Sequence, residues 1–338
     1  MNTSKRVFAT SEIVKVEQLK KYFPVHRSFI EQMVTRKKSY VKAVDEITFS
    51  VRKGEIFTLA GESGCGKSTT GKLILRLISP TSGKIYLNGM DITRSKGEKL
   101  RTLRRQMQMI FQDPYASLSP RMKIGKAIKH PLEISGTAKG KESGKAVLEV
   151  LEKVGLTPAH KFVNLFPHQL SGGQRQRVAL ARSIILKPSF IIADEPVSMI
   201  DASLRTTIID LLLSFRKELG LSYLFITHDL AVAKYISDRI AIMYLGKVIE
   251  IGSKDRLFVN PLHPYTQALL SSIPVPNPER KKKAVELQGD VPSAINIPEG
   301  CRFHPRCPFA RFECIRKEPE LVEVEGDHSV SCLLYWNR

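Results

Sequence analysis

The sequence lacks any long apolar stretch. Its first eighteen residues contain no apolar segment of about ten residues, which a secretory signal would need. Apolar runs such as 190–193 and 240–243 are far shorter than the roughly 20 residues that cross a bilayer. We therefore expect a cytosolic chain without a membrane-spanning helix, in a compartment where disulfides are disfavoured.

Internal repeats and low-complexity tracts are also missing. The chain has 338 residues, of which 42% are hydrophobic and 25% are charged, and these values are ordinary for a soluble globular protein. A chain of this length can bury a full core, so we expect one large domain and a smaller one.

Basic residues exceed acidic ones by a wide margin. The formal net charge is +20, from 53 Lys and Arg against 33 Asp and Glu. The excess is spread over clusters at 36–38, 101–105 and 280–283. Such a balance suits nucleic-acid binding, but it equally suits nucleotide binding beside an anionic membrane, or merely a solvated surface. The net charge alone does not distinguish among these three possibilities.

Strand and helix patterns alternate along most of the chain. The sequence predicts two strands within 44–59, a strand and an Asn-Gly hairpin within 81–92, a largely helical stretch at 120–186 broken at Pro131, Gly136, Pro158 and Pro167, a strand near 190–194, a helix at 202–217, and strands at 223–229 and 239–252. Beyond about Pro261 prolines become frequent. This order predicts a mostly parallel α/β core, a helical insertion and a small, loop-rich C-terminal module.

Residues 61–68, GESGCGKS, match the phosphate-loop pattern GxxxxGK[ST] between a predicted strand and a predicted helix. We expect backbone N–H groups here to surround phosphate oxygens, Lys67 to reach the β- and γ-phosphates, and Ser68 to bind Mg²⁺. Cys65 is then a loop residue and not a catalytic thiol. A chance glycine-rich turn is the weaker alternative. The predicted ATP-binding residues in this segment are Gly61, Ser63, Gly64, Cys65, Gly66, Lys67, Ser68 and Thr69.

Three other segments carry polar residues suited to phosphoryl transfer. The apolar strand IIADEP ends in Asp194, predicted to hold Mg²⁺, and Glu195, predicted to polarise the attacking water. Gln112 in FQDP is expected to touch Mg²⁺ and water, and His228 in FITHD to contact the γ-phosphate. Glu195, His228 and Gln112 are thus the predicted catalytic residues. Ser68, Gln112 and Asp194 are the predicted Mg²⁺ ligands.

Residues 170–174, LSGGQ, precede a predicted helix and form a second expected anion-binding turn. The predicted ligands there are Ser171, Gly172, Gly173 and Gln174. Together, the segments GESGCGKS, FQDP, LSGGQ, ADEP and THD resemble, in this order, the ATP-binding-cassette (ABC) ATPases over roughly residues 12–255. One departure is 198–201, which reads SMID where that family usually has SALD.

The resemblance implies a phosphate-loop ATPase core with an antiparallel β subdomain and a helical subdomain at about 113–185. It also implies that two cassettes pair head to tail, so that 171–174 binds ATP held by a partner's phosphate loop, and that a monomer hydrolyses ATP poorly. The implied adenine-stacking residue is Tyr22 in LKKYF. Tyr40 is the alternative.

The region after residue 255 indicates which type of ABC ATPase the chain resembles. Residues 260–278, with His263-Pro264-Tyr265, and the segment from 287 to 310 resemble the C-terminal region of oligopeptide/dipeptide-type transporter ATPases. The chain looks most like the second of the two ATP-binding subunits in such importers. The implied domains are a nucleotide-binding domain at 1–258 and a C-terminal module at 259–338.

This resemblance also implies partners and a location. The expected partners are a second, paralogous ATPase subunit, two membrane-spanning permease subunits and, indirectly, an extracytoplasmic solute-binding protein. The groove beside Gln112, at about 112–135, is expected to receive a short helix of a permease at the cytoplasmic side of the membrane. The solutes implied are di- and oligopeptides, or oligosaccharides.

The rival hypothesis is a soluble cassette ATPase that acts on nucleic acid or on an iron–sulfur assembly scaffold. The chain has neither the long heptad tracts of the DNA-repair cassettes nor the two cassettes of the ribosomal ones. We therefore expect no nucleic-acid partner.

Four of the five cysteines lie in the tail: Cys301, Cys307, Cys314 and Cys332, with the spacing C-x5-C-x6-C-x17-C. Their number suits ligation of an iron–sulfur cluster or of zinc, although the close C-x2-C pairs of zinc ribbons are missing. The resemblance implies a four-iron, four-sulfur cluster. Zinc, with His304 or His328 replacing one thiol, is the alternative, and four reduced packing thiols are the third possibility.

Overall fold

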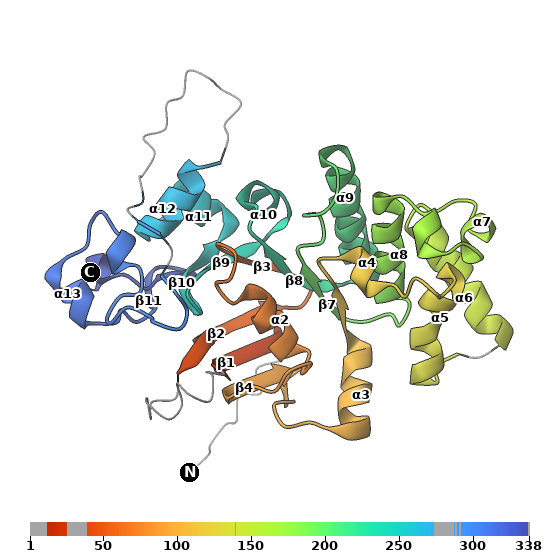
Figure 1. The fold of residues 1–338 in the computed structure, drawn as a ribbon, viewed down its shortest axis with the longest axis horizontal. Helices are drawn as coiled ribbons and strands as arrows, with labels where there is room; N and C mark the ends of the chain where they lie inside the picture. Colours follow the sequence, from red (N-terminus) through yellow and green to blue (C-terminus); the bar gives the residue numbers. More distant parts are fainter. Residues whose placement is uncertain are drawn as a thin grey trace, which may run out of the picture.

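A computed structural model describes residues 12–25, 39–138, 140–273, 287, 289–290 and 292–336 (Figure 1). The predicted basic clusters at 36–38 and 280–283 lie outside these residues. Across the described ranges, no helix has the length and apolarity that a membrane span requires.

A four-stranded antiparallel sheet has the order β2-β1-β4-β5. Its strands are β1 (Glu12–Pro24), β2 (Tyr40–Arg52), β4 (Ser82–Leu87) and β5 (Met90–Asp91). The predicted Asn-Gly hairpin joins β4 to β5, and both Asn88 and Gly89 have positive φ, as the tight hairpin turn requires. The sequence did not predict β1, because its pairing shifts register between Val16 and Leu19 and the alternation of apolar residues is interrupted there.

The larger sheet has eight strands in the order β11-β12-β10-β9-β3-β8-β7-β6. These strands are β3 (Ile56–Ala60), β6 (Met107–Ile110), β7 (Phe190–Asp194), β8 (Ser222–Thr227), β9 (Arg239–Tyr244), β10 (Lys247–Ser253), β11 (Val322–Glu325) and β12 (His328–Val330). The pairs β3–β8, β3–β9, β7–β8 and β6–β7 are parallel, which confirms the α/β core. Every residue of β3, β7 and β8 is buried, as expected where helices cover both faces of a parallel sheet.

Helix α2 (Lys67–Ile74) packs between the two sheets. Leu73 and Ile74 share one hydrophobic core with β1 and β2 on one side and with β3, β7 and β8 on the other. Two further helices follow strands of the larger sheet, namely α9 (Ala202–Leu219) and α10 (Leu230–Ile236). The phosphate-loop segment 61–66 follows the fully buried strand β3 and precedes α2, which packs against both sheets.

The predicted helical insertion is confirmed as a separate lobe at the right of Figure 1. Between the sheets and this lobe lie α3 (Gly97–Gln106) and α4 (Pro114–Ser117); the lobe contains α5 (Ile124–Ser135), α6 (Gly140–Lys153), α7 (His160–Val163), η1 (Pro167–Gln169) and α8 (Gly172–Ile184). The break predicted at Pro131 is wrong, because Pro131 lies inside α5. Gly136 ends α5 with φ 69°, as a C-terminal glycine does.

The C-terminal part lies at the opposite end of the molecule (Figure 1). It contains α11 (Lys254–Val259), α12 (Pro264–Ser271), η2 (His304–Arg306), α13 (Phe312–Arg316) and η3 (Leu333–Tyr335). Its hairpin β11–β12 joins the large sheet, because Glu250 and Ile251 of β10 pair with Val330 and Ser329 of β12. The C-terminal part therefore extends the cassette's own sheet.

Glu250 connects three segments of this region. Its buried carboxylate accepts hydrogen bonds from the backbone N–H groups of Leu262 (2.8 Å) and His263 (2.9 Å), and Oε1 lies 2.8 Å from His328 Nε2. Burial lowers the pKa of His263 to about 4, against the raising effect of Glu250, so this imidazole is neutral at pH 7. Neutral Nδ1 accepts the N–H of Tyr265 (3.0 Å) and caps α12.

We predict that Glu250→Ala lowers the free energy of unfolding by about 3 kcal/mol, because two buried N–H groups lose their acceptor. The measurement is denaturant unfolding of the apo protein. Glu325→Ala, an exposed site on the neighbouring hairpin, is the control and should cost under about 1 kcal/mol. Equal effects of the two variants would contradict the role given to Glu250.

Candidate nucleotide-binding site

The phosphate loop passes very close to two backbone carbonyls. A Cβ on Gly61 would lie 2.3 Å from Met243 O, and one on Gly66 would lie 2.2 Å from Ala43 O. These glycines also have φ values of 149° and 110°. Any side chain at either position would displace the loop from β2 or β9, so the two glycines of the motif are required by packing as well as by backbone conformation.

Lys67 folds back over the loop. Its Nζ donates hydrogen bonds to Gly61 O (2.7 Å) and Glu62 O (2.9 Å), and the residue is buried. Cys65 is buried beneath this ammonium group, and burial raises the pKa of its thiol. Ser63 and Gly64, by contrast, are exposed at the surface of the loop. The loop thus offers backbone N–H groups, a helix N-terminus and one ammonium group to an anion.

Ser68 and Asp194, both predicted Mg²⁺ ligands, lie together. Ser68 Oγ donates a hydrogen bond to Asp194 Oδ1 at 2.8 Å. Burial raises the pKa of Asp194, the charge of Glu195 adds to this effect, and the bond from Ser68 opposes it. A buried carboxylate beside a second carboxylate is the environment in which a hard divalent cation relieves unfavourable charge.

Glu195, Gln112 and His228 converge at the carboxyl ends of adjacent parallel strands. Gln112 Nε2 donates to Glu195 Oε2 (2.9 Å), and His228 Nδ1 lies 3.1 Å from Glu195 Oε1. Glu195 follows β7 directly and has a positive φ of 45°, a strained conformation for a non-glycine residue. The structure thus brings the three predicted catalytic side chains together.

The signature segment, residues 170–174, begins α8 at a different place. Ser171 Oγ accepts from Gln174 N (3.3 Å), and Gln174 Oε1 accepts from Ser171 N (2.9 Å), which forms a reciprocal capping box. Gly173 packs against Leu204, because a Cβ at position 173 would lie only 2.8 Å from Leu204 Cδ1. In the described part of the chain, no hydrogen bond or ion pair joins residues 171–174 to the phosphate loop.

Comparisons with known proteins agree with this geometry. The ABC transporter family profile matches residues 44–198, and the profile "Oligopeptide/dipeptide transporter, C-terminal region" matches residues 249–314. The oligopeptide transport ATP-binding protein AppF of Bacillus subtilis is 46% identical over 326 residues, covering 96% of this chain and 97% of that protein. The dipeptide transport ATP-binding protein DppF of Haemophilus influenzae is 42% identical, covering 93% of this chain and 94% of that protein.

The chain belongs to the ABC transporter ATP-binding proteins that carry this C-terminal region. ATP hydrolysis coupled to transport is the activity of this family. Among solved structures, the dimeric cassette MJ0796, bound to ADP and Pi in a post-hydrolysis state, is 30% identical with a TM-score of 0.62, covering 71% of this chain and 98% of that one. CbiO1 of Clostridium perfringens is 26% identical with a TM-score of 0.62, covering 74% of this chain and 92% of that one.

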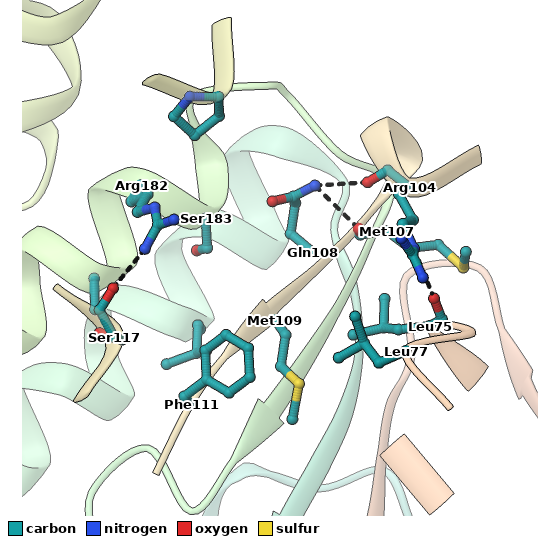
Figure 2. Close-up of a pocket in the computed structure, with 13 residues that line it drawn as sticks. Leu75, Leu77, Arg104, Met107, Gln108, Met109, Phe111, Ser117, Arg182 and Ser183 are labelled. Atoms are coloured by element: carbon teal, nitrogen blue, oxygen red, sulfur yellow. Dashed lines mark hydrogen bonds between the residues drawn. The ribbon is translucent and has the colours of Figure 1, made fainter. Parts of the chain in front are cut away.

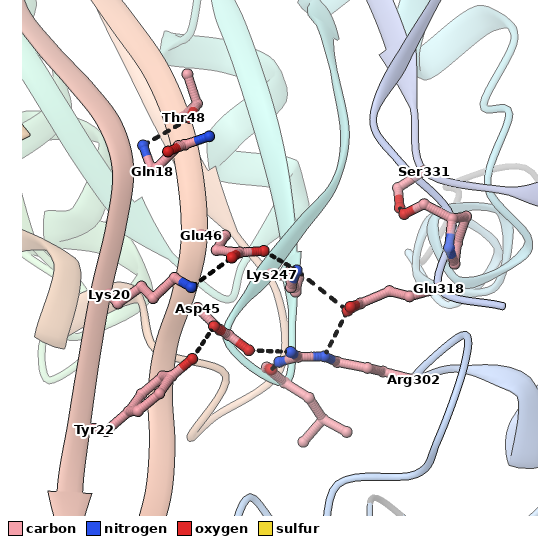
Figure 3. A network of polar contacts seen from close by, with 12 residues as sticks. Gln18, Lys20, Tyr22, Asp45, Glu46, Thr48, Lys247, Arg302, Glu318 and Ser331 are labelled. Atoms are coloured by element: carbon pink, nitrogen blue, oxygen red, sulfur yellow. Dashed lines mark hydrogen bonds and ion pairs between the residues drawn. The ribbon is translucent and has the colours of Figure 1, made fainter. Parts of the chain in front are cut away.

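The two candidate adenine-stacking tyrosines of the cassette differ in their surroundings. The Tyr22 hydroxyl donates a hydrogen bond to Asp45 (Figure 3). Lys42 Nζ lies 5.6 Å from the centroid of the Tyr22 ring. Burial, followed by the bond to Asp45, raises the pKa of Tyr22. Tyr40 begins β2 opposite Pro24 and is exposed. Tyr22 is thus the one held in place by side-chain contacts.

The four tail cysteines of the cassette protein lie in one neighbourhood. Burial raises the pKa of Cys301 to about 12, and the other three tail thiols add to this effect. Within the residues that the structure describes, no three Cys, His, Asp or Glu side chains are grouped closely enough to hold a metal ion. The histidines of the zinc alternative have other contacts: His304 Nδ1 lies 2.9 Å from Cys301 O, and His328 Nε2 meets Glu250.

A groove lies between the core and the helical lobe, and its lining includes Phe111, the residue before Gln112 (Figure 2). Only Ser117 and Pro131 come from the predicted stretch 112–135. The remaining lining residues lie before it and on α8: Leu75, Leu77, Arg104, Met107, Gln108, Met109, Ile110, Phe111, Ala179, Arg182 and Ser183. Phe111 and Leu77 are exposed apolar side chains on this surface.

Sequence reasoning missed three residues around the phosphate loop. The N–H of Glu62 donates to the Tyr265 hydroxyl (3.0 Å), and the Glu62 carboxylate pairs with Arg306 (3.0 and 3.2 Å). The motif His263-Pro264-Tyr265 was visible in the sequence, but nothing in it indicated contact with a loop two hundred residues earlier. No local pattern links Arg306 to Glu62.

Proposed function

We propose that this chain is the ATPase subunit of an importer for di- and oligopeptides, working at the cytoplasmic side of the membrane. The observation that carries the catalytic part is Glu195, held between Gln112 and His228 beside the phosphate loop. The substrate class is supported by the relatives, which are named for oligopeptide and dipeptide transport. None of the relatives described above is named for an action on nucleic acid or on an iron–sulfur scaffold, as the rival hypothesis would have it.

The chemistry follows from the side chains present. Glu195 accepts a proton from a water whose oxygen attacks the γ-phosphorus of ATP. The bond from that phosphorus to the β–γ bridging oxygen breaks, and ADP and inorganic phosphate are the products. Lys67 neutralises negative charge on the β- and γ-phosphates. Ser68, Asp194 and Gln112 would hold Mg²⁺, which would neutralise further phosphate charge. Gln112 and His228 orient Glu195, and His228 also contacts the γ-phosphate.

A second cassette completes the site. Residues 171–174 offer a helix N-terminus to an anion, yet they do not contact the phosphate loop of their own chain. We assign them to the γ-phosphate of ATP bound by a partner cassette, which we infer to be a paralogous subunit. The dimeric state of the related MJ0796 cassette supports this arrangement.

The groove of Figure 2 is the proposed contact with one of the two permease subunits. It combines exposed apolar side chains with Arg104 and Arg182, and it borders the strand that leads to Gln112. A helix pressed into it would move the segment that carries Gln112. A solute-binding protein takes part only through the permeases. We also propose two domains, with the cassette at 1–258 and the C-terminal module at 259–338.

We further propose that the tail cysteines bind a four-iron, four-sulfur cluster. The proposal is supported by the proximity of the tail thiols, which contribute to the raised pKa values of Cys301 and Cys332, in a module of short elements. The described residues contain no group of three Cys, His, Asp or Glu side chains close enough to hold a metal ion, and this holds for zinc and for the cluster alike. The cluster is preferred to zinc because the resemblance to oligopeptide-type transporter ATPases implies it.

We predict that Glu195→Gln lowers the kcat for ATP hydrolysis at least about a hundredfold, because the general base is lost. ATP binding should persist, since Lys67 and Ser68 are unchanged. Steady-state phosphate release and equilibrium ATP binding are the measurements. Glu218→Gln, exposed near the end of α9, is the control and should keep wild-type kcat. Wild-type turnover in Glu195→Gln would refute the assignment.

For the cysteines, we predict about four irons per chain in anaerobically purified protein, together with broad visible absorbance. Cys301→Ser should lose this iron, while Cys65→Ser, which alters the thiol in the phosphate loop, should retain it. Metal analysis and absorbance spectra give the answer. One zinc per chain would replace the cluster, and a chain without either metal would leave the four thiols as packing residues.

A further inference from the structure

The turn between Cys301 and Cys307 reaches the phosphate loop. Arg306 lies in this turn, and its side chain is buried, with 8% exposed. Both terminal nitrogens of its guanidinium contact the Glu62 carboxylate, at 3.0 and 3.2 Å. This two-point geometry is the strong form of an arginine–carboxylate pair. The pair is partly buried, with 28% of the Glu62 side chain exposed, which reduces its screening by salt.

Glu62 is the second residue of the phosphate loop and makes contacts through every polar group it has. Its carbonyl accepts a hydrogen bond from Lys67 Nζ, and its N–H donates to the Tyr265 hydroxyl. Its carboxylate meets Arg306. The C-terminal module therefore holds this loop residue from two directions, through Tyr265 and through Arg306.

The turn that carries Arg306 is itself anchored to the core. Arg302, also buried, forms an ion pair with Asp45 and donates to Leu245 O, and its Nε lies 3.3 Å from Glu318 (Figure 3). The residue after Leu245 also contacts the phosphate loop, since Gly246 N donates to Cys65 O (2.9 Å). Arg306 is thus presented to Glu62 from a fixed support.

Glu62 places a negative charge in a loop whose function is to bind an anionic phosphate group. A phosphate loop binds a strongly anionic group, and a bare carboxylate within it would repel that group. The Arg306 guanidinium neutralises this carboxylate and at the same time fixes the residue whose carbonyl accepts from Lys67. None of the contacts of Arg306 involves Glu195, Gln112 or His228.

We propose that Arg306 is a positioning residue for nucleotide binding: by pairing with Glu62 it masks a negative charge inside the phosphate loop and holds the loop in its binding conformation. This inference rests on the nucleotide site proposed above. It assigns to the cysteine-bearing module a direct role in ATP affinity. It also predicts that Arg306 affects KM for ATP and leaves kcat nearly unchanged.

The test is a double-variant cycle with Mg²⁺ and a fluorescent ATP analogue in equilibrium titration. Arg306→Met should weaken binding about tenfold, which is within the coupling energies of close charge pairs. Arg306→Lys keeps the charge and should lie between Arg306→Met and wild type. In Arg306→Met with Glu62→Gln, the unmasked charge is gone, so affinity should return to within about threefold of wild type.

Steady-state hydrolysis supplies the second readout. For Arg306→Met, KM for ATP should rise with the dissociation constant, while kcat should change less than about twofold. The matched control is Arg316→Met, an exposed arginine of the same module that stacks on Phe312, and it should bind ATP like wild type. A double variant as weak as Arg306→Met, or a control as weak, would overturn the inference, because the loss would then reflect damage to the module.

Lys67→Ala separates this inference from the proposed function. If wild type fails to bind the analogue, or Lys67→Ala binds it equally well, the proposed nucleotide site is wrong. If Lys67→Ala loses binding while Arg306→Met keeps wild-type affinity, the site stands and the role of Arg306 is refuted.

Discussion

The close approach of the phosphate loop to two backbone carbonyls is the constraint on which the rest of the structure depends. Gly61 lies against Met243 O and Gly66 against Ala43 O, so β2 of the antiparallel sheet and β9 of the core sheet both contact the loop directly. Any element that shifts either strand must shift the phosphate site. The conformation of the phosphate loop therefore depends on both sheets and on α2, which is buried between them.

Buried polar contacts join the loop-rich C-terminal part to this scaffold. Glu250 accepts two backbone N–H groups and meets His328, which ties β10, the start of α12 and β12 together. Neutral His263 caps α12, and Tyr265 then reaches Glu62. Each residue of the His-Pro-Tyr motif thus has a physical role: a cap, a first-turn proline and a contact to the phosphate loop.

Much of the fold and of the catalytic centre could be predicted from the sequence, because both depend on local patterns. Buried parallel strands appear as continuous apolar runs, and polar residues at their carboxyl ends meet by topology, as Glu195, Gln112 and His228 do. Contacts between distant segments could not be predicted: Arg306 with Glu62, Arg302 with Asp45, and His328 with Glu250 have no signature in sequence spacing. Strand β1 was missed for a local reason, since its bulges interrupt the apolar alternation.

The central claim is that ATP hydrolysis at this site drives peptide uptake through membrane subunits. The most direct measurement reconstitutes the chain with its companion ATPase and two permease subunits in liposomes, and follows uptake of labelled di- and oligopeptides delivered by the solute-binding protein. The account predicts uptake that requires ATP and stops when Glu195→Gln replaces the wild-type chain. ATP hydrolysis without uptake of any peptide, in a chain that copurifies with nucleic acid and binds no permease, would contradict it.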